Sequence, residues 1–187
     1  MEVHLIRHTP VNISKKICYG RLDVPLLDSF NHDILKIKNL LLNKYDIVFT
    51  SPSKRCIALA EALKFSNIIK DNRLFELSFG DWEGVKWDEI DENLLNHWME
   101  DFVNVSPTNG ESFYEMYLRV SNFIEQLRNK DYNDVLIISH SGVIRCFLAY
   151  LLKFPLNNSF KIPVGFYEQY IFKIDSNPLF DSIVKMR

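Results

Sequence analysis

The sequence predicts an α/β fold in which a mostly parallel central sheet is flanked by helices, giving a three-layer sandwich. Short apolar runs rich in β-branched residues alternate with stretches whose apolar residues recur at helical spacing. This alternation is typical of α/β proteins, in which helices cover the faces of the sheet. The chain has 187 residues, 47% of them hydrophobic and 25% charged. These values predict one globular domain spanning residues 1–187.

Apolar runs predict the strands. The first begins at Val3 and ends with Arg7 and His8, before Thr9-Pro10. Further strands are expected over residues 45–50, 135–139 and 170–174, with strand and loop material at 68–69 and 74–79. Because residues 9–27 hold Gly20, two prolines and mixed charges, we expect a loop there.

Capping residues and apolar periodicity predict the helices. Residues 30–41 have helical spacing, and Ser51 with Pro52 predicts a helix start as N-cap and first helical residue. Ser112 and Glu115 form a capping-box pattern ahead of the clearest helix, which extends to Leu127. A last helix covers residues 143–152. Residues 82–99 are aromatic and acidic, and we expect them to lie over the mouth of a site, with Trp98 packing inside that segment.

Three strand ends carry cationic or potentially cationic side chains. Arg7 and His8 end the first strand, Arg55 follows the second, and His140 follows the strand at 135–139. A single histidine after a strand is usually a turn residue. Three strand ends with cationic side chains, however, do not help to pack an apolar core. The carboxyl ends of parallel strands meet at one edge of a sheet, and buried cations are costly unless an anion meets them. A phosphate group would satisfy all three.

These motifs resemble those of the histidine phosphatase, or phosphoglycerate mutase-like, superfamily. Arg7-His8-Thr9 is similar to its Arg-His-Gly signature, with Thr in the Gly position. Residues 50–60, 74–84 and 138–145 resemble its next three markers in the same order. The resemblance spans about residues 3–149 and implies a phosphoglycerate mutase-like fold. Residues 107–113 are similar to a Gly-Glu-Ser segment of short members such as α-ribazole phosphatase.

The resemblance implies a role for each matching position. His8 is the expected nucleophile, Glu76 the proton donor and His140 a hydrogen-bonding partner of the phosphoryl group. Arg7 and Arg55 are expected to bind the phosphate, because the planar guanidinium matches two of its oxygens. The other expected substrate-binding residues are Asn12, Arg21 and Ser141.

Some of these assignments have alternatives. Asn12 lies two positions earlier than the family's usual Asn, so a loop cap is as well supported for it as a ligand role. Pro10 replaces a usual Glu. Glu83 and Glu111 are alternative proton donors, although each fits a structural role better. His4 and His8 lie about 13 Å apart along one strand, too far to share an ion, so we predict no metal and no cofactor.

The leading hypothesis is a metal-independent phosphomonoesterase that acts through phospho-His8 on a small phosphorylated metabolite, with α-ribazole 5′-phosphate as the specific candidate. One alternative is a mutase primed by a bisphosphorylated compound, and another is a non-catalytic module that binds a phosphorylated ligand. The net charge of −2 predicts no nucleic-acid or membrane partner. With no signal peptide pattern and three cysteines without paired spacing, we expect a cytoplasmic protein, as a monomer or homodimer.

Overall fold

The computed structural model describes residues 1–186, and its centre is a six-stranded sheet with the strand order β3-β2-β4-β1-β5-β6. The strands are β1 (Glu2–Arg7), β2 (Ile47–Thr50), β3 (Ile68–Lys70), β4 (Asp134–Ser139), β5 (Gln169–Lys173) and β6 (Ser182–Met186). Strands β3, β2, β4 and β1 are parallel, whereas β5 is antiparallel to both of its neighbours. The predicted α/β class with a mostly parallel sheet is confirmed.

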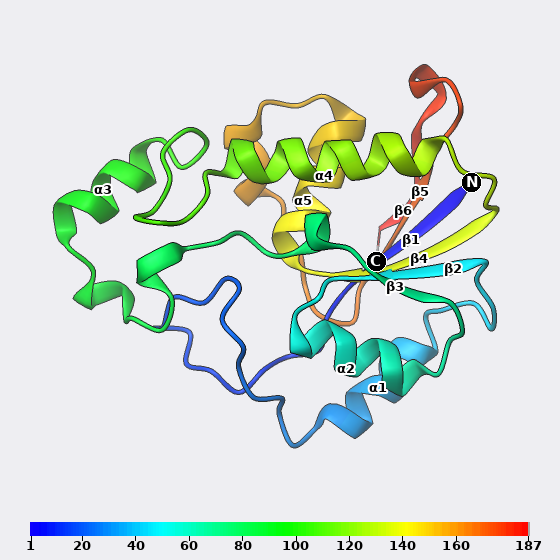
Figure 1. Cartoon of the computed structure of the whole chain (residues 1–187), viewed down its shortest axis with the longest axis horizontal. Coiled ribbons are helices and arrows are strands. Elements are labelled where there is room, and N and C mark those ends of the chain that lie inside the picture. Colours follow the sequence, from blue (N-terminus) through cyan, green and yellow to red (C-terminus); the bar gives the residue numbers. More distant parts are fainter. Residues whose placement is uncertain (187) are drawn as a thin grey trace.

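Helices cover both faces of this sheet (Figure 1). One face carries α1 (Phe30–Lys38) and α2 (Lys54–Leu63), and the other carries α4 (Phe113–Arg128) and α5 (Ser141–Leu152). Each face of the sheet packs in its own hydrophobic core, and successive residues of a strand point alternately into the two cores. In β1, Val3 and Leu5 belong to the core under α4 and α5, whereas Ile6 belongs to the core under α1 and α2.

The helix α3 (Glu92–Glu100) lies away from the sheet, at the left of Figure 1. It belongs to the aromatic segment that the sequence places over the site. Trp82 is buried, and Trp98 packs against Trp82, Trp87 and Phe79 with ring centroids 5.7–6.3 Å apart. The expected packing role of Trp98 is therefore confirmed.

One predicted helix start needs correction, and one strand was not predicted. The helix α2 begins at Lys54 with Ser53 as N-cap, so Ser51 and Pro52 do not start it. The reason is that the Ser51 N–H donates to the Ile138 carbonyl at 3.0 Å and so extends the ladder between β2 and β4. The strand predicted at residues 170–174 is also followed by β6, for which the sequence shows no clear apolar run.

The capping box predicted at the start of α4 is confirmed. The Ser112 hydroxyl accepts from the Glu115 N–H at 3.2 Å, and the Glu115 carboxylate accepts from the Ser112 N–H at 2.7 Å. Within residues 1–186, no helix combines the length and apolar character needed to cross a membrane.

Candidate active site

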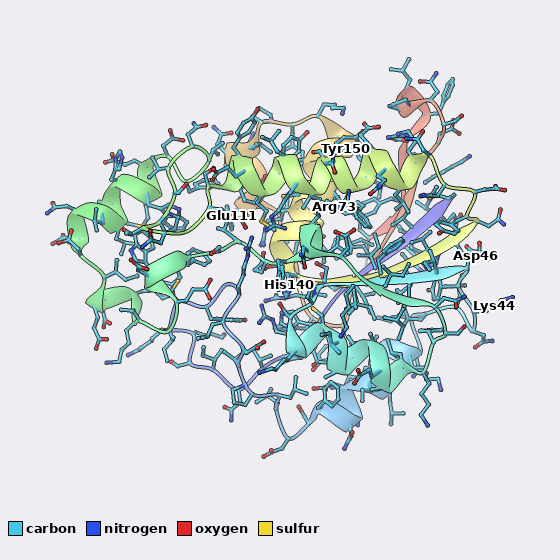
Figure 2. All side chains as sticks on the ribbon, viewed as in Figure 1. Lys44, Asp46, Arg73, Glu111, His140 and Tyr150 are labelled. Carbon is cyan, nitrogen blue, oxygen red and sulfur yellow. The ribbon has the colours of Figure 1, made fainter. Side chains whose placement is uncertain are left out.

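The candidate site lies where the parallel strands end. The His8 N–H donates to the Ser139 carbonyl at 2.9 Å, so the first residue after β1 remains hydrogen-bonded to β4. His140 follows β4 directly, and the His8 and His140 rings lie 5.2 Å apart. Figure 2 shows His140 and Glu111 far from Asp46 and Lys44, which mark the opposite edge of the sheet. The sheet therefore brings the two histidines together as predicted.

One tautomer of His8 is selected by its backbone contact. Its Nδ1 lies 2.7 Å from the Thr9 carbonyl oxygen, which can only accept, so Nδ1 carries the proton. The lone pair is then left on Nε2. Burial, and then the charges of Arg55 and Arg7, hold the pKa of His8 well below its usual value. His8 is thus a neutral imidazole with one unprotonated nitrogen, which is the form a nucleophile requires.

Arg7 and Arg55 are held beside His8 by backbone carbonyls. Arg7 Nη1 donates to the Val164 carbonyl at 3.0 Å, and its guanidinium lies 3.8 Å from the centre of the Phe166 ring. Arg55 is 1% exposed and donates to the carbonyls of Gly20 and Leu22.

The buried Nε atoms of both arginines have no hydrogen-bond partner within residues 1–186. An unmet buried donor is costly, and the oxygens of a phosphate would meet both.

His140 occupies a position behind His8 and Arg55. Its Nδ1 lies 3.3 Å from Arg55 Nη2, which can only donate, and its Nε2 lies 2.8 Å from the Ser51 hydroxyl. Both ring nitrogens thus have protein partners, and burial, His8 and the nearby arginines hold the pKa of His140 well below its usual value. The direct contact of His140 with a phosphoryl oxygen stays a prediction.

The carboxylate of Glu76 sits at the start of α5. It accepts from the Gly142 N–H at 3.2 Å and from the Ser141 hydroxyl at 3.2 Å. A Cβ on residue 142 would lie 2.2 Å from Glu76 Oε1, so only glycine leaves room for this carboxylate. Ser141, expected as a substrate ligand, therefore also positions Glu76.

The backbone of Glu76 is held by two arginines that share one acid. Arg21 Nε and Arg119 Nη2 donate to the Glu76 carbonyl at 3.2 and 3.1 Å, and both guanidinium groups bind Glu111, at 2.8 and 2.6 Å. Arg119 also donates to the Phe75 carbonyl at 2.8 Å. These contacts give Arg21 and Glu111 a structural role in this arrangement, in support of Glu76.

A cavity of about 170 Å³ joins these residues. Its polar and charged lining, within the described part of the chain, comes from Arg7, His8, Arg55, Glu76, Ser141 and Arg145, and its apolar and aromatic lining from Tyr19, Leu77, Phe79, Phe113 and Phe160, with Gly142 between them. The predicted nucleophile, proton donor and two phosphate-binding arginines thus face one space.

One predicted ligand and one alternative proton donor lie outside this lining. Asn12 is exposed, and its backbone N–H donates to the Pro25 carbonyl at 2.8 Å. The Glu83 carboxylate accepts from the N–H groups of Arg21 and Phe79, at 2.9 and 3.0 Å, and so ties two loops together. The structure therefore brings neither Asn12 nor Glu83 into the cavity.

Arg145 is a cavity residue that was not among the predicted site residues. It lies on α5, one helical turn after Ser141, so both side chains project from the same side of the helix. This spacing, inside a segment that already carried His140, was the available signal.

The sequence predicts no metal site. In residues 1–186, the His, Cys, Asp and Glu side chains close enough to share an ion are Glu2, His4 and Asp134, with ligand atoms within 4.8 Å of one another. They lie at the opposite ends of β1 and β4 from the cavity. The cavity lining includes His8 and Glu76 but no other histidine or acid of the described chain, and independence from metal stays a prediction.

Comparison with known proteins agrees with this geometry. Residues 3–178 match the family model described as histidine phosphatase superfamily (branch 1). The chain belongs to this superfamily. It is 31% identical over 167 residues to the adenosylcobalamin/alpha-ribazole phosphatase of Escherichia coli, covering 83% of this chain and 81% of that protein. It is 32% identical over 120 residues to phosphoserine phosphatase 1 of Hydrogenobacter thermophilus, covering 60% and 56%.

A solved structure supports the same assignment. The alpha-ribazole phosphatase from Shigella flexneri superposes with a TM-score of 0.88 at 26% identity, covering all of this chain and 96% of that one. As a histidine phosphatase, the protein is an enzyme of the phosphatase class with a phosphoglycerate mutase-like fold.

Proposed function

We propose that this histidine phosphatase is a metal-independent phosphomonoester hydrolase that works through a phosphohistidine at His8. The observation that carries the proposal is the 2.7 Å contact between His8 Nδ1 and the Thr9 carbonyl, which leaves the lone pair on Nε2. Arg7 and Arg55 beside it supply two permanent positive charges for a phosphate dianion.

The first half of the reaction forms the phosphohistidine. Nε2 of His8 attacks phosphorus in line as the ester P–O bond breaks, and the leaving alkoxide takes a proton from the Glu76 carboxyl. Arg7 and Arg55 balance the charge on the phosphoryl oxygens, which is the main catalytic contribution in phosphoryl transfer. His140 supports this arrangement through its contact with Arg55.

The second half releases phosphate. A water molecule gives a proton to the Glu76 carboxylate and attacks phosphorus, the N–P bond breaks, and neutral His8 is restored. A mutase would instead pass the phosphoryl group to a hydroxyl of a bound acid. Dependence of turnover on a bisphosphorylated primer would indicate the mutase, and ligand binding without turnover would indicate a binding module.

The substrate is proposed to be a small phosphorylated metabolite. The names of the relatives point to two different alcohols, α-ribazole and serine. α-Ribazole 5′-phosphate is one candidate, and the aromatic walls of the cavity, such as Phe79 and Phe113, suit its flat ring.

The test is phosphatase activity on p-nitrophenyl phosphate and α-ribazole 5′-phosphate in the presence of a chelator, for the native protein and His8→Ala. We expect chelator-resistant turnover that falls by at least about 10³-fold in the variant. Trapping of ³²P in acid-labile form on the native protein alone would identify the phosphohistidine. Full activity in His8→Ala would exclude His8 as the nucleophile.

A further inference from the structure

Arg145 is held in the catalytic cavity with most of its guanidinium donors free. Its Nε donates to the Ile162 carbonyl at 3.2 Å, and its guanidinium lies 5.1 Å from the centre of the Phe160 ring. Within residues 1–186, neither Nη atom has a hydrogen-bond partner. The side chain is therefore oriented by the protein, and it lines the cavity with its two outer nitrogens unpaired.

The lack of a direct ion pair distinguishes Arg145 from the other well-packed arginines outside the phosphate site. Three of those form ion pairs at 2.6–2.7 Å, namely Arg73 with Asp71, Arg119 with Glu111, and Arg128 with Asp181. Within the described chain Arg145 forms no such pair, although the charge of Glu76, in the same cavity lining, acts on it. A partly desolvated guanidinium without a direct ion pair is suited to an anion from outside the protein.

The cavity lining holds one arginine more than the two assigned to the phosphate. Arg7 and Arg55 match a phosphate dianion in charge, and Arg145 lines the same cavity. A substrate with a second anionic group would pair that group with Arg145.

We propose that Arg145 forms a second anion subsite, and that the substrate is a small phosphorylated carboxylic acid whose carboxylate binds there. This inference rests on the proposed phosphatase reaction and narrows its substrate class. The planar guanidinium matches a carboxylate with two parallel hydrogen bonds. The cavity volume of about 170 Å³ is below the roughly 300–1,000 Å³ of sites for drug-sized ligands, which also favours a compact acid over α-ribazole 5′-phosphate.

Two matched substrate pairs test the subsite. O-Phosphoserine and O-phosphoethanolamine differ only by the carboxylate, and 3-phosphoglycerate and glycerol 3-phosphate differ by a carboxylate in place of a hydroxymethyl group. We expect the native enzyme to prefer the acid of at least one pair by about 10-fold or more in kcat/KM. In Arg145→Met, kcat/KM for that acid should fall much further than for its uncharged partner, so that the preference approaches one.

Two further variants separate recognition from structure. Arg145→Lys keeps the charge but loses the planar fork, and it should retain part of the preference. Lys161→Met removes an exposed cation near Phe160 and should retain all of it.

Equal loss on both members of a pair in Arg145→Met would overturn the subsite, because it would give Arg145 only a structural role at Ile162. No preference in the native enzyme, or a strong preference for α-ribazole 5′-phosphate over both acids, would also overturn it while leaving the phosphatase reaction intact. No turnover of these substrates or of p-nitrophenyl phosphate would instead refute the proposed function.

Discussion

Replacing Arg119 by Met should impair the proposed proton donor, Glu76, more than the proposed nucleophile, His8. Arg119 donates to the carbonyls of Phe75 and Glu76 at 2.8 and 3.1 Å and to Glu111 at 2.6 Å, so it fixes the backbone on both sides of the Glu76 N–H. A misplacement of about 1 Å costs on the order of 10²-fold in rate. We therefore expect kcat/KM for an alkyl phosphate to fall by about 10²-fold.

The assay compares two leaving groups. The p-nitrophenolate ion departs without a proton, so its kcat/KM does not depend on Glu76 as an acid. For p-nitrophenyl phosphate we expect a loss of less than about 10-fold in Arg119→Met. Arg73→Met is the matched control, because Arg73 belongs to the same region but donates to Asp71 and not to Glu76.

The same substitution should lower stability. The side chains of Arg119 and Glu111 are 17% and 15% exposed, so removal of the arginine leaves a largely buried acid whose remaining cationic partner is Arg21, at 2.8 Å. Breaking a fully buried pair costs about 3–5 kcal/mol, and the retained contact with Arg21 lowers the expected cost here to about 2 kcal/mol. For a chain of this size, about 2 kcal/mol corresponds to a fall in Tm of about 4–8 °C. Equal losses of kcat/KM on both substrates, measured well below the Tm, would refute the positioning role of Arg119.

Three other predictions follow from the site. Gly142→Ala should reduce kcat/KM by about 10²-fold, because its Cβ would lie 2.2 Å from Glu76 Oε1, and an active alanine variant would contradict this reading. The pKa values of His8 and His140 are lowered in the fold, so below pH 6.5 the unfolded chain binds more protons than the folded protein. As the pH decreases below 6.5, these two groups should lower the free energy of unfolding by up to about 2.7 kcal/mol per pH unit. Urea titrations at several pH values should show a shallower fall in His140→Gln. Burial raises the pKa of Cys56 to about 12, so this thiol should react with a disulfide reagent at pH 8 only after unfolding, as followed by mass spectrometry.

The parts of the fold that local chemistry determines could be predicted from the sequence. The capping box at Ser112 needs only residues three apart, and the burial of β1 and β4 shows as continuous apolar runs. The strand β6 gives a weaker signal, because it is an edge strand whose residues alternate between exposed and half-buried. The start of α2 depends on a backbone bond from Ser51 to a distant strand, which no local pattern contains.

The candidate site also has some features that local sequence predicts and others that depend on tertiary packing. Arg7, His8 and Arg55 could be placed together because the ends of parallel strands converge on one edge. The partners of Arg21 and Arg145 could not be predicted, since guanidinium groups reach several residues away and their acceptors here are carbonyls and one acid from other loops. Sequence indicates that such an arginine exists, but only the packed loops determine whether its donors are used within the protein.

The arginines of the cavity have an effect on His8 as well as on the phosphate. Burial, together with Arg55 and Arg7, holds the pKa of His8 low, so the proposed nucleophile is unprotonated without a separate base. A bound phosphate dianion neutralises these charges and removes part of what opposes protonation of His8. The Thr9 carbonyl already holds the Nδ1 proton, so a further proton could be gained only at Nε2, the nitrogen that must face phosphorus. When phosphate is bound, the neighbouring arginine charges oppose protonation of His8 least. At that stage the contact between Nε2 and phosphorus leaves no room for a proton on Nε2.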